Sequence, residues 1–241
     1  LLSEELAQLS AKFRRLTAAK GQPFTFTTNL SGNQHLLEIM LRDNIDVRYR
    51  HLVSGRQNVL LVYLMGLTHS RLLHESVISP LITYNTSRPL TPQRVVSSVL
   101  SANAVSLPEH PSDAIEMMMS GGVLLFLEGY VQCIAVHIPQ NAKRGVSNSK
   151  TETVIFGPHD AFNETLEDNI ALIRRRTRDT NVKVRLLSLG ERSHTSLAII
   201  YCANLIKPGL LEDVESRLKA IKVDLILYSN TIEEYLSSRT W

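Results

Sequence analysis

Three consecutive arginines, Arg174, Arg175 and Arg176, are the side chains of this sequence best suited to bind another charged group. A guanidinium is a permanent cation whose five donors match the two oxygens of a carboxylate. The positions three and four residues before and after Arg174 hold no acid, so no carboxylate of its own helix can pair with it. Asp179 could reach both Arg175 and Arg176 but cannot fully neutralise two cations. The cluster therefore indicates either a solvated basic helix end or a contact surface.

The same segment carries a polar residue, Asn169, on the apolar side of its predicted helix. Apolar residues recur on that side at helical spacing, as Phe162, Leu166, Ile170 and Ile173. A buried amide without hydrogen-bond partners costs about 1–3 kcal/mol, so we expect Asn169 to have fixed partners. The turn Gly157-Pro158 precedes the helix, and Asp160 is placed to cap its first N–H groups.

The other reactive side chains form no catalytic constellation. Ser193 and His194 are adjacent in an extended segment, where neighbouring side chains point to opposite sides, and no G-x-S-x-G turn surrounds them. His69 and His74 are five residues apart, whereas two zinc ligands on one helical face need a spacing of four. The sequence also lacks a glycine-rich phosphate-binding motif. We therefore predict a non-enzymatic protein that uses no cofactor and no metal.

A turn at Gly190-Glu191-Arg192 joins two apolar runs and places Glu191 and Arg192 at the tip of a predicted hairpin. We expect these two side chains to form a salt bridge or to contact the arginine cluster. An exposed ion pair of this kind contributes only about 0–1 kcal/mol.

The composition is that of an ordinary globular protein. Hydrophobic residues make up 44% of the 241 residues and charged residues 20%, which suits one large or two small domains. The net charge is only +3, and residues 150–192 contain eight basic and seven acidic residues, which argues against nucleic acid as a partner. Cys133 and Cys202 lie in apolar strand-like runs, as buried thiols of a reducing compartment do. No uncharged apolar run approaches the roughly 20 residues of a membrane span.

The periodicity predicts an α/β fold with two mixed α/β subdomains, each a small sheet packed with helices. The subdomains are residues 1–142 and 146–241, because the polar, turn-rich stretch 139–150 is typical of a linker. The predicted helices are 2–20, one starting near Ser31, 69–79, 92–101, 112–119, one opening at Pro208, and 232–238. The predicted strands are 47–53, 58–64, 123–127, 131–138, Val182–Leu189, Thr195–Cys202 and 224–228. We find no internal repeat in the sequence.

Residues 151–178 resemble the Gly-Pro-x-x-x-Phe…Asn-x-x-Leu-Ile-Arg-Arg-Arg signature of spore germinant receptor A subunits, the GerA-type family. Residues 189–195, Leu-Gly-Glu-Arg-Ser-His-Thr, are a second match, and the helix–strand–helix pattern of residues 208–236 is a third. The specific matches cover roughly residues 143–241. The preceding part fits the family in length and in the order of its elements.

The resemblance implies a cytosolic N-terminal domain that precedes several membrane-spanning helices in the spore inner membrane. Its expected partners are the receptor B and C subunits, other A subunits, and the membrane through a C-terminal part beyond Trp241. The domain would support assembly or gating of a nutrient-gated ion channel. The candidate contact surface comprises Gly157, Pro158, Asn169, Arg174, Arg175, Arg176, Glu191 and Arg192.

Three alternatives remain open. The cleft between the subdomains could bind a small nutrient, since ligand pockets favour domain interfaces. Within the family, the chain could be the late-sporulation paralogue of the A subunit. An unrelated α/β enzyme is the third alternative, against which the missing catalytic constellation argues.

Overall fold

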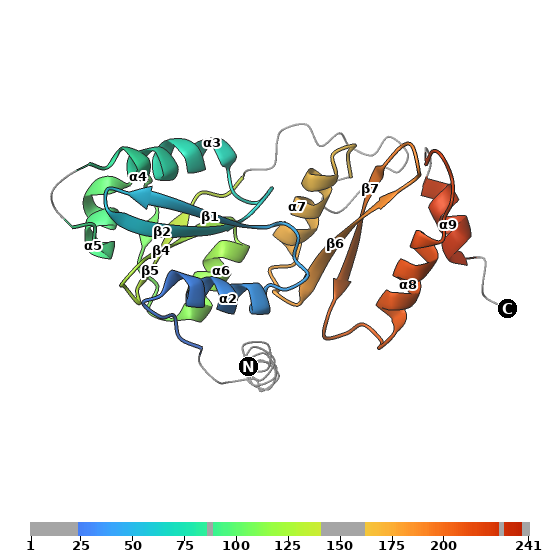
Figure 1. Ribbon diagram of the computed structural model, residues 1–241, viewed down its shortest axis with the longest axis horizontal. Coiled ribbons are helices and arrows are strands. Elements are labelled where there is room, and N and C mark those ends of the chain that lie inside the picture. The colour runs from blue at the N-terminus through green and yellow to red at the C-terminus, as the bar shows by residue number, and fades with distance from the viewer. Residues whose placement is uncertain (1–23, 86–88, 141–161, 227–228, 238–241) are drawn as a thin grey trace, which may run out of the picture.

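The computed structural model describes residues 24–85, 89–140, 162–226 and 229–237. These residues form two sheets with flanking helices, arranged side by side as two lobes (Figure 1). We use N-terminal lobe for the elements from α2 to β5 and C-terminal lobe for those from α7 to α9. The predicted α/β fold class is confirmed. The predicted subdomain limits fall among residues 141–161, outside the described part, and stay a prediction.

The N-terminal lobe is built on five antiparallel strands in the order β1-β2-β4-β5-β3. The strands are β1 (Val47–Ser54), β2 (Gln57–Leu64), β3 (Val105–Ser106), β4 (Gly122–Leu127) and β5 (Cys133–His137). The apolar runs of β2 and β4 are buried on both faces, which places these strands inside the sheet. The two-residue strand β3 had no signal in the sequence.

Helices cover both faces of this sheet. On one face, α2 (Leu30–Met40) and α6 (Pro111–Met119) pack on side chains such as Leu60 and Phe126. On the other face, Leu61 and Leu125 pack against a continuous helical run and a shorter one. These runs are α3 (Ser70–Leu73), η1 (His74–Ile78) and α4 (Ser79–Thr83), and α5 (Pro92–Arg94) with η2 (Val95–Val99).

The C-terminal lobe consists of one hairpin and three helices. β6 (Val182–Leu189) and β7 (Thr195–Cys202) pair antiparallel over the predicted ranges. Leu187, Leu197 and Ile199 pack against α8 (Leu210–Lys219) and α9 (Ser229–Ser237). The signature helix, α7 (Leu166–Arg176), lies between the hairpin and the N-terminal lobe (Figure 1).

Two expectations about the C-terminal lobe are wrong. Helix α7 begins only at Leu166, directly after Thr165, so Phe162 lies outside it and is 67% exposed. The predicted cap, Asp160, lies outside the described residues. Asn163 Oδ1 instead accepts a hydrogen bond from the N–H of Thr165 at 2.8 Å, a local turn that competes with helix. The described residues 224–226 form no strand. The carbonyl oxygens of Val223 and Asp224 instead accept hydrogen bonds from the backbone N–H groups of the turn at residues 191–193. The predicted helix 2–20 lies outside the described residues.

Both lobes open with the same unit, an 11-residue helix followed by a hairpin of two eight-residue strands. In each helix the fourth residue is an asparagine that bonds the backbone six residues earlier. Asn33 accepts from the N–H of Thr27 at 2.7 Å and donates to its carbonyl at 2.8 Å. Asn169 makes the same two bonds with Asn163, both at 2.8 Å.

Gly66 allows α7 to approach the N-terminal lobe closely. It follows β2 with a φ of +81°, and a Cβ there would lie 3.1 Å from Ala171 Cβ and 3.3 Å from the carbonyl oxygen of Glu167. The backbone of one lobe therefore touches the helix of the other.

We expect Gly66→Ala to destabilise the chain more than Gly129→Ala. Both glycines have positive φ, 81° and 85°, so both variants carry similar backbone strain of about 1–2 kcal/mol. A Cβ at Gly129 meets nothing within 4 Å, whereas at Gly66 it meets α7, and overpacking adds about 1–3 kcal/mol. Urea unfolding of both variants measures the difference. Equal losses would contradict the close approach of α7.

Candidate functional site

Arg174 is only 1% exposed and lies where the two lobes meet. Its Nε and Nη2 donate to Oδ2 and Oδ1 of Asp46 at 2.9 and 3.0 Å, a bidentate ion pair. Nη2 also donates to Asn44 Oδ1 at 2.7 Å, and Nη1 donates to the carbonyl oxygen of Val182 at 2.6 Å. The guanidinium thus joins α7, the α2–β1 loop and the first residue of β6.

The loop that receives Arg174 also pairs with the edge of β6. Val184 donates its N–H to the carbonyl of Asp43 at 2.9 Å and accepts from the N–H of Ile45 at 3.1 Å. This short parallel bridge makes the α2–β1 loop a neighbour of β6. Asp43 adopts a φ of 62°, a left-handed conformation that costs a non-glycine residue about 1–2 kcal/mol. The lobes are therefore joined by backbone as well as by side chains.

A second charged cluster lies nearer to solvent. Arg185, with 32% of its side chain exposed, donates to Glu215 Oε1 at 2.6 Å and to Asp43 Oδ1 at 3.0 Å. The hydrogen bond from Arg185 lowers the pKa of Glu215. Tyr201 lies 3.5 Å from the other oxygen of Asp43, and burial, followed by the Asp43 charge, raises the pKa of Tyr201. Solvent screens this cluster, so it holds the lobes together less strongly than Arg174 does.

A groove of about 440 Å³ runs between α2, β1, β6 and α8. Its size falls in the range of roughly 300–1,000 Å³ that small-ligand pockets occupy. Ile45 and Leu186 line it and are 47% and 45% exposed, which gives it an apolar wall. The complete lining is Glu38, Leu41, Asp43, Asn44, Ile45, Val47, Tyr49, Val184, Arg185, Leu186, Leu187 and Glu215.

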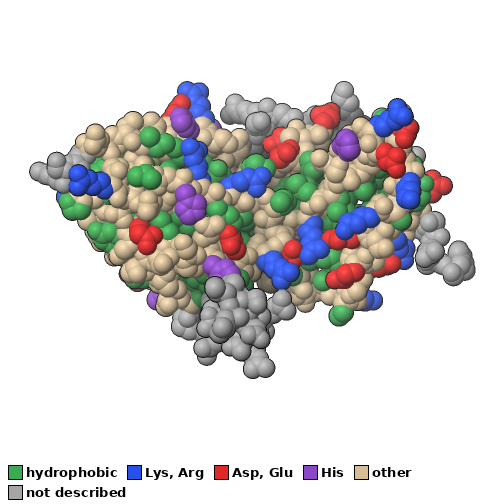
Figure 2. Space-filling view, in the orientation of Figure 1, with side chains coloured by type: hydrophobic (Ala, Val, Ile, Leu, Met, Phe, Trp, Pro, Cys, Tyr) green, Lys and Arg blue, Asp and Glu red, His purple; other side chains and the backbone are tan. Residues whose placement is uncertain are grey.

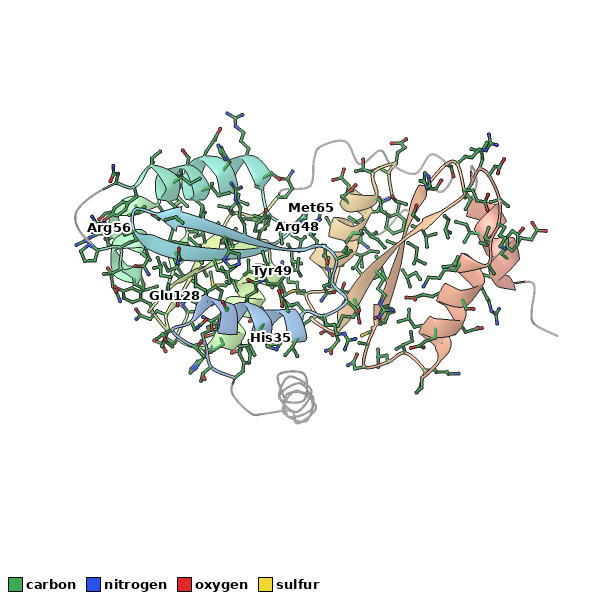
Figure 3. All side chains as sticks on the ribbon, in the orientation of Figure 1. His35, Arg48, Tyr49, Arg56, Met65 and Glu128 are labelled. Carbon is green, nitrogen blue, oxygen red and sulfur yellow. The ribbon has the colours of Figure 1, made fainter. Side chains whose placement is uncertain are left out.

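Besides Asp43 and Asn44, which join the lobes, Tyr49 and Glu38 are the polar residues that line the N-terminal side of this groove. Figure 3 shows Tyr49 between β1 and α2. The residue is half-buried, and its hydroxyl has no hydrogen-bond partner among the described residues. Burial, followed by the charge of Glu38, raises the pKa of Tyr49, so the phenol stays protonated and can donate. Glu38 is exposed and accepts from Gln34 Nε2 at 2.7 Å, which leaves acceptor capacity for a second donor.

The other residues of the candidate contact surface are not gathered in one place. Asn169 is half-buried and is occupied by its bonds to Asn163. Arg175 is half-buried and Arg176 exposed at the end of α7. Gly157 and Pro158 lie outside the described residues. On the face of Figure 2, acidic and basic side chains interleave over the C-terminal lobe rather than forming a patch of one sign.

Glu191 and Arg192 lie in the turn at the far end of β6. Strands rise about 3.3 Å per residue, so the turn lies about 23 Å from Val182, the residue that Arg174 contacts. The expected contact between this turn and the arginine cluster is wrong. Arg192 Nε instead lies 3.4 Å from Asp224 Oδ2, and both side chains are exposed.

The sequence reasoning missed the acceptors of Arg174. Asn44 and Asp46 lie 130 and 128 residues away in the chain, and no local periodicity connects such distant groups. The available signal was one of complementarity: an arginine without a local acid, and a loop, Asp43-Asn44-Ile45-Asp46, rich in acceptors. Arg185 and Glu215 gave no comparable signal.

The described part of the chain contains no cluster of three or more His, Cys, Asp or Glu side chains arranged to hold a metal ion. Within the same residues, no helix has both the length and the apolar composition needed to cross a bilayer.

A family model described as Bacillus/Clostridium GerA spore germination protein matches residues 35–241. Spore germination protein KA of Bacillus subtilis (strain 168) is 25% identical over 226 residues, 92% of this chain and 42% of that protein. Stage V sporulation protein AF of the same strain is 30% identical over 201 residues, 81% of this chain and 40% of that protein. The chain thus spans less than half the length of these relatives.

A crystal structure has the same fold. It is the N-terminal domain of the A subunit of the Bacillus megaterium spore germinant receptor GerK3, with a TM-score of 0.64. The match covers 92% of this chain and 83% of that chain at 18% sequence identity. At this identity the likeness establishes the fold alone.

We expect Arg174→Met to destabilise the chain by about 3–5 kcal/mol, because it leaves Asp46 buried and unpaired. Adding Asp46→Asn should recover part of this loss, since the uncompensated charge is then removed. Arg175→Met is the matched control on the next residue, and we expect it to change stability by less than about 0.5 kcal/mol. Urea unfolding measures all three variants. A loss below 1 kcal/mol for Arg174→Met would contradict the central role of this ion pair.

Proposed function

Because the chain belongs to the GerA family of Bacillus/Clostridium spore germination proteins, we propose that it acts as the N-terminal domain of a germinant receptor A subunit. In this role it supports assembly or gating of a membrane channel complex and catalyses no reaction. This chain matches less than half the length of each of these relatives, which supports the proposal that it acts as one domain of a larger receptor. Its partners would be the B and C subunits and other A subunits, with the domain on the cytosolic side of the spore inner membrane.

The single observation that carries this proposal is the buried junction at Arg174. The signature helix α7 is fixed to the N-terminal lobe by a bidentate ion pair with Asp46 and a further hydrogen bond to Asn44, and the same guanidinium also donates to Val182 of β6. A displacement of the C-terminal lobe would therefore be passed to the N-terminal lobe through a rigid contact rather than through a linker. A gating relay needs such a connection between distant surfaces.

The groove supports a second candidate function, the binding of a small nutrient between the lobes. It combines an apolar wall at Ile45 and Leu186 with a donor at Tyr49 and an acceptor at Glu38. Small-molecule sites typically pair apolar surface with a few such polar groups. Both lobes contribute to the lining, so a bound nutrient would contact both.

For the assembly role, we expect charge reversal of the β6–β7 turn, Glu191→Lys with Arg192→Glu, to reduce nutrient-triggered germination in the full-length receptor. Both side chains are exposed, so the fold should tolerate the change. Arg56→Glu, at the distant end of the N-terminal lobe (Figure 3), is the matched control and should germinate normally. Germination rates are compared at receptor levels measured by immunoblot. Normal germination at normal level would contradict a contact role for the turn.

The nutrient-binding candidate predicts that one compound among amino acids, sugars and nucleosides raises the melting temperature of the purified chain. A ligand at 100 times its Kd adds about 2.7 kcal/mol, a rise of roughly 5–10 °C for this size. Leu186→Lys should abolish the shift by placing a charged side chain in the groove. Val131→Lys, at a similarly exposed apolar residue (52%) outside the groove lining, should keep it. A panel without any shift would contradict this second function.

A further inference from the structure

The acidic side chains that line the groove differ in whether they already have a cationic partner. Asp43 and Glu215 share Arg185, whose guanidinium donates to them at 3.0 and 2.6 Å. Lys219 approaches the second oxygen of Glu215 at 3.5 Å. Arg185 is the only cation among the described residues of the lining, and its charge is taken up by these two acids. The lining therefore offers no free cation to an anionic ligand group.

Glu38 is the lining acid that forms no ion pair in the described structure. Its Oε1 accepts from Gln34 Nε2 at 2.7 Å. Gln34 Oε1 in turn accepts a 2.6 Å hydrogen bond from His51 Nε2. This chain of hydrogen bonds orients the carboxylate and leaves its second oxygen free to accept from a ligand.

Tyr49 lies close enough to Glu38 for the carboxylate charge to contribute to its raised pKa, after burial. No hydrogen bond joins these two side chains in the part of the chain that the structure describes. Two oxygen acceptors that lie near each other without contact suit a donor group that can reach both. An ammonium group has three donors and no acceptor, and aromatic rings such as that of Tyr49 also attract cations.

We propose that the groove binds a small organic cation, an amine with an apolar body and without a carboxylate or phosphate group. Its ammonium group binds Glu38 and Tyr49, and its apolar part covers Ile45 and Leu186, which are 47% and 45% exposed. A zwitterionic amino acid is disfavoured, because its carboxylate meets three acidic side chains and no free cation. An uncharged sugar leaves Glu38 without a counter-charge. This inference rests on the second candidate function and names the ligand class of that groove.

Three compounds with one apolar body test the ligand class. Phenethylamine carries an amine, phenylalanine carries the same amine with a carboxylate, and 2-phenylethanol carries a hydroxyl group. In calorimetric titrations of the purified chain, phenethylamine should bind at least tenfold more tightly than either of the other two. The reason is that hydrogen bonds to a charged group are stronger than those between neutral groups.

Three variants test the residues that bind the amine. Glu38→Gln keeps the size of the side chain and removes its charge, so it should weaken phenethylamine binding at least tenfold. Tyr49→Phe removes a hydroxyl without a partner among the described residues and should weaken this binding about two- to tenfold. Glu116→Gln is the matched control, because Glu116 is an exposed acid of α6 outside the groove lining. It should bind phenethylamine as the unchanged chain does.

The outcomes separate this inference from the function on which it rests. Phenylalanine binding as tightly as phenethylamine, or unchanged amine binding in Glu38→Gln, would overturn the cationic ligand class. Groove binding itself would still stand if another nutrient bound and Leu186→Lys abolished that binding. If no compound bound, both the ligand class and the nutrient-binding function would fail. The assembly role is tested at the β6–β7 turn and does not depend on these titrations.

Discussion

The buried ion pair between Arg174 and Asp46 fixes how the two lobes meet. Removing a guanidinium from water costs several kcal/mol, and this cost is offset only where its donors are well satisfied. Here four hydrogen bonds from one side chain require three elements to be in register: the end of α7, the start of β6 and the α2–β1 loop. Two other features help to hold α7 in the position that this ion pair requires. Gly66 lets α7 approach, and Asn169 fixes the start of the helix that presents Arg174.

The two lobes use one local design in different surroundings. Asn33 and Asn169 close the same turn before helices of equal length, and each helix leads into a hairpin of equal strands. In the N-terminal lobe the hairpin joins three further strands, so β2 is buried on both faces. Within the described residues of the C-terminal lobe the hairpin is two-stranded, and the residues of β7 are mostly half-buried. Its β6 edge is partly filled by residues 43–45, which is why the first lobe is needed to complete the second.

Sequence patterns predicted what depends on neighbours in the chain. Alternation and turn residues defined β6 and β7 to the residue, and the apolar run of β2 marked it as an inner strand. The patterns gave wrong predictions where a segment could form either a regular element or a local turn contact. Asn163 forms its own turn, so α7 starts later than its periodicity indicates, and residues 224–226 look like a strand but accept bonds from a turn. The junction could not be predicted because Arg174 and Asp46 are 128 residues apart. The lack of a local acid beside Arg174 indicated a distant partner but not its identity.

The groove and the junction share residues, so a ligand in the groove would contact residues that also join the lobes. Asp43, Asn44, Val184 and Arg185 line the groove and also join the lobes. A ligand can shift the arrangement only through a difference in affinity between two arrangements. Ile45 and Leu186 supply such a difference, since both are nearly half exposed and a closer approach of the lobes around a ligand would bury them. Arg174 is buried, whereas the Arg185 cluster is partly in solvent. A closing motion of the lobes would therefore keep the Arg174–Asp46 ion pair and rearrange the partly exposed ion pairs of Arg185.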